Sequence, residues 1–287
     1  IAKRVRSKVP DIVIVDANFG MFEEDLQTAG EIVKVQQAHE NHWPRTVLAA
    51  TAKNHKERTI EIVEMLGDTL PPTAAVQSTD DTVLGTIKRK NVSADTLISL
   101  ARHVDKQGGQ SEAEIILCIP DDTRQAHFKS VFDMLDAGMT FIRMYQFMLL
   151  PGTSGASLES REKHQMETRF RVLPRCFGNY RFRDETFPSA EVEEICISNA
   201  TMPYQHYQDC RDLNLTVEIF NNDSIFADVA LFLNRFGIPR SRWLNEIYEL
   251  IRKRGGALAK IYEDYREEEK KNLWLDLEQV ESFYSQE

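Results

Sequence analysis

Polar side chains that could bind a ligand follow five short apolar segments of this 287-residue sequence. Carboxylate and amide oxygens accept hydrogen bonds, and a lysine ammonium can hold a carboxylate or a phosphate. Each position also has a structural interpretation, because Asp and Ser commonly close turns or cap helices. The candidate groups are Asp16 and Asn18; Thr51, Lys53 and Asn54; Gln77 and Ser78; Asp121 and Asp122; and Tyr145 and Gln146.

The cysteines and histidines indicate no metal site. The four cysteines are Cys118, Cys176, Cys196 and Cys210, and no two have CxxC or CxxxCxxC spacing. We predict that Cys118, which lies in an apolar run, is a buried strand residue rather than a nucleophile. The close pair His39 and His42 would need two further ligands to hold zinc. No Ser-His-Asp set and no glycosidase-type carboxylate pair can be inferred.

Composition excludes several classes of protein. Lys and Arg total 35 against 45 Asp and Glu, which gives a net charge of −10 and a pI near 5.3. Nucleic acid is therefore not an expected partner. Hydrophobic residues make up 42% of the chain, which is enough for a sizeable core. No apolar run approaches the roughly 18 residues that span a bilayer, and no signal peptide is visible. We expect a cytoplasmic protein without a membrane span.

The elements that would position the polar groups alternate between strand and helix. Between the apolar segments, residues such as Ile60, Val63 and Leu66 recur at helical spacing. This alternation predicts an α/β fold with a parallel sheet, either an open doubly wound sheet or a barrel. We favour the barrel, since no GxGxxG or Walker motif follows any strand. The predicted strands are residues 12–15, 46–50, 73–76, 114–119 and 141–147.

The pattern changes after Leu150. A polar stretch is followed by residues 170–182, which are dense in arginine and aromatic side chains. From about residue 190 we predict mostly helix, with one strand at 215–220. Residues 266–271 are expected to be a solvated helix face. We therefore divide the chain into residues 1–155, a connection at 156–190 that closes the barrel, and a mostly helical extension at 191–287.

Five motifs in order carry a resemblance to a known family. The sequences DIVIVDANFGMF at 11–22, TAKN at 51–54, AVQSTDDTVLGTIKRKN at 75–91, EIILCIPDDT at 114–123 and LLPGT at 149–153 resemble strands two to six of a radical S-adenosylmethionine core barrel. They are most similar to the branch in which a cobalamin-binding domain often precedes the barrel. The resemblance implies a partial (β/α)6 TIM-type barrel at residues 1–155, with the first strand missing.

The resemblance also assigns cofactor-binding roles to individual residues. It places Asp16, Ala17 and Asn18 at the amino group of S-adenosylmethionine. Gln77 and Ser78 would contact the ribose and carboxylate, with Arg89 favoured over them as the carboxylate partner. Residues 116–120, including Ile116 and Cys118, would lie along the adenine, although Cys118 stands where a glycine is common. Tyr145 and the turn at 151–152 would close over the adenine.

The departure from the family has consequences for activity. Members hold a 4Fe-4S cluster through CxxxCxxC and cleave S-adenosylmethionine to a 5′-deoxyadenosyl radical for hydrogen abstraction or methyl transfer. That motif is absent here, so we expect a chain truncated before its cluster loop and inactive by itself. The full-length protein would use S-adenosylmethionine, the cluster and possibly cobalamin, and we expect none of them to be stably bound to this chain alone. It would also need a reductase, flavodoxin or ferredoxin as electron donor and an unknown small-molecule or lipid-like substrate.

Two other interpretations stay open. A degenerate, cluster-less barrel could act as a binding or interaction module. An unrelated barrel enzyme could use Lys53 or Asp16 for acid-base chemistry on a small metabolite. The first would fit a natural start codon just before Ile1, and the second would fit turnover by a stable, cluster-free chain.

Overall fold

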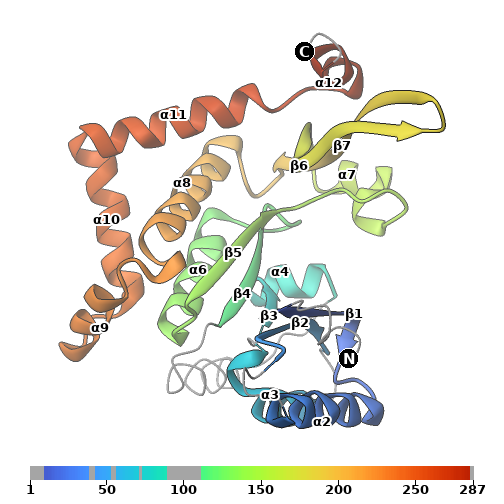
Figure 1. The fold of residues 1–287 in the computed structure, drawn as a ribbon. Helices are drawn as coiled ribbons and strands as arrows, with labels where there is room; N and C mark the ends of the chain where they lie inside the picture. Colours follow the sequence, from blue (N-terminus) through green and yellow to red (C-terminus); the bar gives the residue numbers. More distant parts are fainter. Residues whose placement is uncertain (1–9, 39–42, 53–55, 71–72, 89–110, 285–287) are drawn as a thin grey trace. The chain divides into compact units, whose positions relative to one another are not determined.

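A computed structural model describes residues 10–38, 43–52, 56–70, 73–88 and 111–284, and it shows a mixed α/β protein (Figure 1). The described residues divide into two compact units. Unit 1 draws on Ile1–Val76, Asn91–Glu114 and Met134–Arg143. Unit 2 draws on Gln77–Lys90, Ile115–Asp133 and Met144–Glu287. Each unit is described by itself.

In unit 1, two parallel strands carry a layer of helices on one face. Strands β1 (Asp11–Phe19) and β2 (Thr46–Thr51) pair in parallel, and helices α2 (Glu23–Ala38) and α3 (Lys56–Leu66) pack against them. Alternation along β1 turns Ile12 and Ile14 toward this core, whereas the side chains of Val13 and Val15 are 64% and 96% exposed. The core residues are Phe19, Ala29, Ile32, Val47, Ile62, Val63, Leu66 and Leu70.

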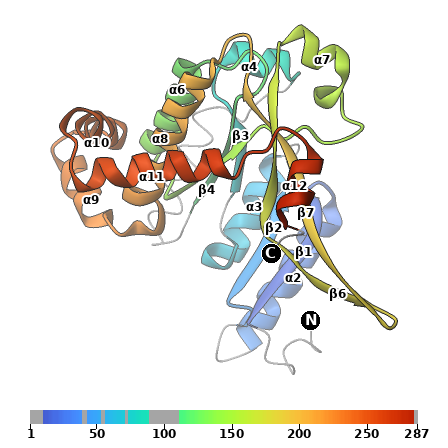
Figure 2. The same ribbon diagram turned by 90° about the horizontal axis from the view of Figure 1, so that it is seen from above.

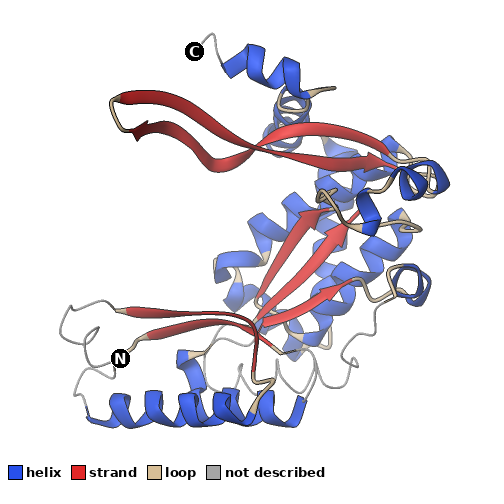
Figure 3. Ribbon diagram, turned by 90° about the vertical axis from the view of Figure 1, so that its right-hand side faces the viewer, coloured by secondary structure: helices blue, strands red, loops and turns tan. Residues whose placement is uncertain are grey.

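A second sheet has the order β3-β4-β5, and the arrowheads of its three strands lie at the same end (Figure 3). The strands are β3 (Thr73–Gln77), β4 (Glu112–Leu117) and β5 (Phe141–Gln146), and the helices that follow β3 and β4 are α4 (Asp81–Thr86) and α6 (Arg124–Ala137). All five strands expected from the sequence are therefore present, with ends that differ by a few residues.

The expected single barrel sheet is not confirmed by this topology. Among the described residues, β1 and β2 form a two-stranded sheet of their own and β3, β4 and β5 form another. A barrel sheet needs an unbroken series of ladders, and the ladder between β2 and β3 is not among them. The finding supports a mixed α/β architecture rather than the specific partial (β/α)6 barrel.

A long antiparallel hairpin occupies much of the expected connection at 156–190. Strand β6 (Glu167–Phe182) pairs with β7 (Glu185–Ser198) (Figure 2). The expectation of helix from residue 190 is therefore wrong as far as Ser198. The last residues of β7 also pair with the segment after β5, since the Leu149 N–H donates to the Glu194 carbonyl and the Cys196 N–H to the Phe147 carbonyl, both over 2.9 Å.

The rest of unit 2 is helical. The strand expected at 215–220 is wrong, because these residues end helix α8 (Tyr204–Phe220). The buried positions Tyr207, Cys210, Leu213 and Val217 follow one helical face through the β-branched segment. The other helices are α7 (Leu158–Lys163), α9 (Ala227–Arg235), α10 (Arg240–Arg254), α11 (Ala257–Lys271) and α12 (Leu277–Tyr284), with 3₁₀ helices η1 (Gly67–Thr69), η2 (Ser154–Ala156) and η3 (Asn222–Ser224).

Two further expectations for the helical region can be compared with the structure. Residues 266–271 lie in α11, where Lys270 pairs with Glu267 over 3.1 Å. The expected solvated face is only partly present, because the Glu269 side chain is 11% exposed and pairs with Arg211 of α8. Among the described helices, none is both long enough and apolar enough to cross a membrane.

We expect residues 12–15 of β1 to exchange amide hydrogens faster than residues 115–119. Strand β1 pairs only with β2 among the described residues and leaves one face to solvent, whereas Ile115 and Leu117 are fully buried in the middle strand of three. Hydrogen-exchange mass spectrometry on the intact protein measures both peptides in one experiment. Equal protection of the two segments would contradict the prediction.

Candidate functional site

Three non-glycine residues at the ends of β3 and β4 have a left-handed backbone. Gln77 ends β3 with φ +64°, Cys118 follows β4 with φ +66°, and Asp121 has φ +66° in the turn that leads into α6. A Cβ makes this conformation unfavourable, so it persists only where surrounding groups hold it. Such residues concentrate at functional sites, and they mark the turn at 118–122 as the best-defined candidate.

The Asp122 carboxylate holds the turn at 118–122 from inside. Its Oδ2 accepts the backbone N–H of Cys118 at 3.0 Å, and its Oδ1 accepts that of Thr123 at 2.9 Å. The side chain is buried, and this burial raises its pKa to about 7 despite the two hydrogen bonds. The sequence predicts Asp121 and Asp122 as one candidate pair and does not indicate which of the two is buried.

Asn199, in the turn between β7 and α8, holds the same segment from outside. Its Nδ2 donates to the carbonyl of Ile119 at 3.2 Å and to that of Cys118 at 3.4 Å. Its Oδ1 accepts the N–H groups of Thr201 and Met202 at 3.0 and 2.9 Å. The Thr201 hydroxyl in turn donates to the Asp122 carbonyl over 2.6 Å. This buried asparagine therefore fixes the turn at 118–122, and no signal in the sequence identified it.

Asp121 faces outward and links neighbouring elements. Its Oδ2 accepts the hydroxyl of Thr86 in α4 at 2.6 Å, and its Oδ1 lies 3.3 Å from Nδ1 of His164. The side chain is partly exposed. It ties α4 and the segment before β6 to the turn at 118–122.

The segment after β3 is the helix cap expected from its sequence. Asp80 caps α4 by accepting the N–H groups of Thr82 and Val83 at 2.9 and 3.2 Å. Ser78 is buried, and its hydroxyl lies 3.2 Å from that of Ser130 and accepts the Asp80 N–H at 3.1 Å. The Ser78 hydroxyl is thus occupied by contacts within the protein.

The other predicted residues of unit 2 differ in accessibility. Ile116 packs against the apolar cluster of Val83, Ile119 and Ala126, and Cys118 is fully buried. Gln77 is half-buried, and Tyr145 near the end of β5 is 40% exposed. Gln77, Ser78, Cys118 and Tyr145 therefore lie at or next to the carboxyl ends of three neighbouring strands, β3, β4 and β5, and Gln77 and Tyr145 keep part of their surface exposed.

Asp16, Ala17 and Asn18 are exposed residues within β1 of unit 1, since this strand continues to Phe19 instead of ending at residue 15. The ladder with β2 breaks its register between Ile14 and Phe19. The Asp16 Oδ1 accepts the Asn18 N–H at 2.8 Å, which is the Asx turn considered for this motif. Arg89, Lys53, Asn54, His39 and His42 lie outside the described residues.

The described residues offer no ligand set for an iron–sulfur cluster. No group of three or more His, Cys, Asp or Glu side chains among them could hold a metal ion. Cys118, Cys196 and Cys210 are buried and Cys176 is half-buried. A hydrogen bond with Cys196, together with burial, raises the pKa of the Cys118 thiol well above its usual value, so the nucleophilic thiolate is disfavoured as expected.

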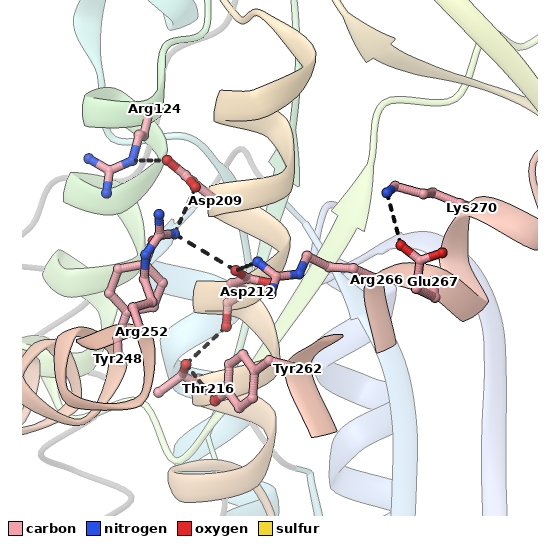
Figure 4. A network of polar contacts seen from close by, with 10 residues as sticks. All are labelled: Arg124, Asp209, Asp212, Thr216, Tyr248, Arg252, Tyr262, Arg266, Glu267 and Lys270. Carbon is pink, nitrogen blue, oxygen red and sulfur yellow. Dashed lines mark hydrogen bonds and ion pairs between the residues drawn. The ribbon is translucent and has the colours of Figure 1, made fainter. Parts of the chain in front are cut away.

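A second polar cluster in unit 2 has a structural explanation (Figure 4). Asp209 of α8 pairs with Arg124 of α6 at 3.0 Å and with Arg252 of α10 at 2.7 Å. Asp212, one turn further along α8, accepts Arg266 of α11 at 3.1 Å. Burial raises the pKa of Asp212 to about 6. The cluster joins α8 to three helices through paired charges.

Two characterised methyltransferases are similar to the chain in sequence. The first is the cobalamin-dependent radical SAM methyltransferase TokK of Streptomyces tokunonensis, 28% identical over 275 residues, which are 91% of this chain and 39% of TokK. The second is the 2-(S-pantetheinyl)-carbapenam-3-carboxylate methyltransferase of Streptantibioticus cattleyicolor, 30% identical over 79% of this chain and 33% of the relative. The chain thus spans between a third and two fifths of these relatives. No protein-family model matches it.

Solved structures of radical SAM enzymes are more distant. The methyltransferase TsrM from Kitasatospora setae, solved with cobalamin and a [4Fe-4S] cluster, matches with a TM-score of 0.46 and 14% identity over 63% of this chain and 35% of TsrM. The oxidase HemN from Escherichia coli matches with a TM-score of 0.30 and 8% identity over 49% of this chain and 43% of HemN. TM-scores below 0.5 do not establish a shared fold.

Proposed function

Because the chain is related in sequence to cobalamin-dependent radical S-adenosylmethionine methyltransferases, we propose that it belongs to an enzyme that transfers a methyl group to a small molecule. The alignment with TokK over 91% of the chain carries this proposal. Its role would be to bind S-adenosylmethionine at the carboxyl ends of β3, β4 and β5. One relative is named for a carbapenam carboxylate, and from this we take only that the acceptor is a small molecule.

The contacts at these strand ends favour some predicted binding residues over others. The Cys118 N–H is held by Asp122 and the Ser78 hydroxyl contacts Ser130, so neither is our choice for the nucleoside. Gln77 and Tyr145 keep accessible surface, and an exposed tyrosine ring can stack on adenine. We therefore assign nucleoside binding to Gln77 and Tyr145, and we keep Asp16 and Asn18, with exposed oxygen acceptors, as candidates for the amino group.

The described residues offer no set of side chains that fits the cluster. S-adenosylmethionine, when bound, supplies the activated methyl and adenosyl groups. The residues of this chain would orient it and limit its contact with water. Since the sequence has no CxxxCxxC motif, we propose that this chain by itself does not cleave S-adenosylmethionine reductively. The 4Fe-4S cluster, cobalamin and a protein electron donor would be required in the complete enzyme.

Replacing Tyr145 by alanine should raise the Kd for S-adenosylmethionine about tenfold, since stacking of a base on an aromatic ring contributes about 1–3 kcal/mol. Equilibrium dialysis with radiolabelled S-adenosylmethionine and the intact protein measures this change. The matched control is Tyr180→Ala, which removes a tyrosine from β6 that is 51% exposed. Equal effects of the two substitutions would contradict the assigned site.

The proposed reaction and the alternative of a non-catalytic module are separated by a second measurement. The complete protein is reconstituted anaerobically with iron and sulfide, reduced, and assayed for 5′-deoxyadenosine and for methyl transfer from labelled S-adenosylmethionine. Neither product above background, with S-adenosylmethionine still bound, would support the binding module and overturn the enzymatic proposal.

A further inference from the structure

Two buried thiols from distant parts of the chain meet beside the turn at 118–122. The Sγ atoms of Cys118 and Cys196 lie 3.6 Å apart, although 78 residues separate them in sequence. Both side chains are fully buried. The Cys196 thiol also donates to the Ser198 carbonyl at 3.1 Å, and Asn199 Nδ2 lies 3.6 Å from the Cys118 sulfur. The two sulfurs therefore contact each other inside a fixed set of neighbours.

The backbone on either side of this thiol pair is held by hydrogen bonds. Cys118 is fixed through its N–H by Asp122, and Cys196 through its N–H by the Phe147 carbonyl. A disulfide bond is about 2.05 Å long, so the sulfurs must approach by roughly 1.5 Å. Bond formation would require side-chain rotation to supply this movement while the strands stay folded. The other cysteines lie on other elements, Cys176 in β6 and Cys210 in α8.

We propose that Cys118 and Cys196 form a disulfide when the protein is exposed to a peroxide, and that this bond fastens the turn at 118–122 to the end of β7. Because both thiols are buried, peroxide reaches one of them only during a local opening of this segment, oxidises it to a sulfenic acid and releases water. The second thiol attacks that sulfur, the S–S bond forms, and a second water leaves. The two thiols lose two electrons in total, and the peroxide gains them as its O–O bond breaks. A dithiol reverses the change.

The bond would restrain a long loop and one unusual turn. It closes the chain between residues 118 and 196, which lowers the conformational entropy of the unfolded state. It also removes the freedom of Cys118, whose left-handed backbone is held only by hydrogen bonds in the reduced protein. Oxidation should therefore raise Tm by about 5 °C, and reduction should reverse the rise.

The test uses the intact protein before any iron–sulfur reconstitution. It is treated with hydrogen peroxide, free thiols are blocked under denaturing conditions, and the protein is digested without reduction. We expect mass spectrometry to find two peptides joined through Cys118 and Cys196, with a mass two hydrogens below the sum of the separate peptides. Treatment with a dithiol should separate the two peptides. Tm is followed on the same samples.

Two variants show whether the pairing is specific. Cys196→Ala should abolish the linked peptide and the rise in Tm, whereas Cys210→Ala, which removes another buried thiol, should leave both unchanged. The proposal fails if peroxide links Cys118 to another cysteine, converts it to sulfinic acid without a link, or leaves both thiols reduced until the protein unfolds.

Discussion

Replacing Asn199 by leucine should lower the free energy of unfolding by about 3 kcal/mol. The substitution keeps the number and branching of the side-chain heavy atoms but leaves the carbonyls of Cys118 and Ile119 and the N–H groups of Thr201 and Met202 without their partner. Each buried polar group that loses its hydrogen bond costs about 1–3 kcal/mol, and part of that cost is recovered by local rearrangement. The loss should exceed that from the same substitution at Asn214, the asparagine of α8.

Urea unfolding of the wild-type protein and the Asn199→Leu variant measures this difference at constant m-value. The matched control is Asn214→Leu, which removes another buried amide of unit 2. Asn214 is buried, and its side chain forms a hydrogen bond with His127, whose Nε2 lies 2.9 Å from the Asn214 Oδ1. We expect the control to lose about 1 kcal/mol. If the Asn199 variant lost no more unfolding free energy than the Asn214 variant, the turn at 118–122 would keep its shape without the hydrogen bonds from Asn199.

The contribution of Asp122 to the free energy of unfolding should fall as the pH rises from about 4 to about 7. Its pKa lies near 7 in the folded protein, against an ordinary value of 3.8, so the folded state holds the proton more tightly than the unfolded chain. The associated stability is present below pH 4 and is lost as the pH passes through the folded pKa. At about 1.4 kcal/mol per pKa unit, the contribution is at most about 4 kcal/mol. Asp212, with a pKa near 6, acts in the same direction, whereas His127, whose pKa burial lowers to about 4, acts in the opposite direction.

Substituting Asp122 by asparagine should remove this contribution, so the variant should lose less stability than the wild-type protein between pH 5 and pH 8. The amide cannot ionise, although it can accept only one of the two N–H groups that the carboxylate accepts, so the variant should also be less stable at pH 5. Unfolding free energies at pH 5 and pH 8 provide the comparison, with Asp68→Asn as a control at an exposed aspartate. An unchanged slope in the Asp122 variant would mean that this carboxyl is ionised throughout the range.

The strands and helices of residues 11–146 could be predicted because their signals are local. Apolar β-branched runs followed by turn residues gave each of the five strands, and Ile60, Val63 and Leu66 gave α3. The segment 215–220 was misjudged because Leu215, Val217 and Ile219 fit a strand when viewed over six residues. The helical period of α8 becomes visible only with Tyr207 and Cys210 included. The predicted connection at 156–190 overlooks an alternation of charged and apolar side chains at Arg169, Phe170, Arg171 and Val172. These residues lie in strand β6 of the hairpin.

The candidate site could be predicted only in part for a different reason. The positions of Gln77, Cys118 and Tyr145 at strand ends follow from the strands themselves. The role of Asn199 does not follow from the strands, because this residue donates to a carbonyl 81 residues earlier in the chain. A single asparagine between serine and alanine also forms no recognisable local pattern. Which of Asp121 and Asp122 becomes buried likewise depends on the packing of the β7–α8 turn, where Thr201 contacts the Asp122 carbonyl.

The distance in sequence between Cys118 and Asn199 has a consequence for biosynthesis. During translation, the turn at 118–122 is made about 80 residues before its clamp, which at roughly 5–20 residues per second is a delay of about 4–16 seconds. Throughout that interval the carbonyls of Cys118 and Ile119 must be hydrated, and the apolar faces of β4 and α6 lack part of their cover. The nascent chain is therefore expected to depend on chaperones most strongly between the synthesis of α6 and that of residue 202.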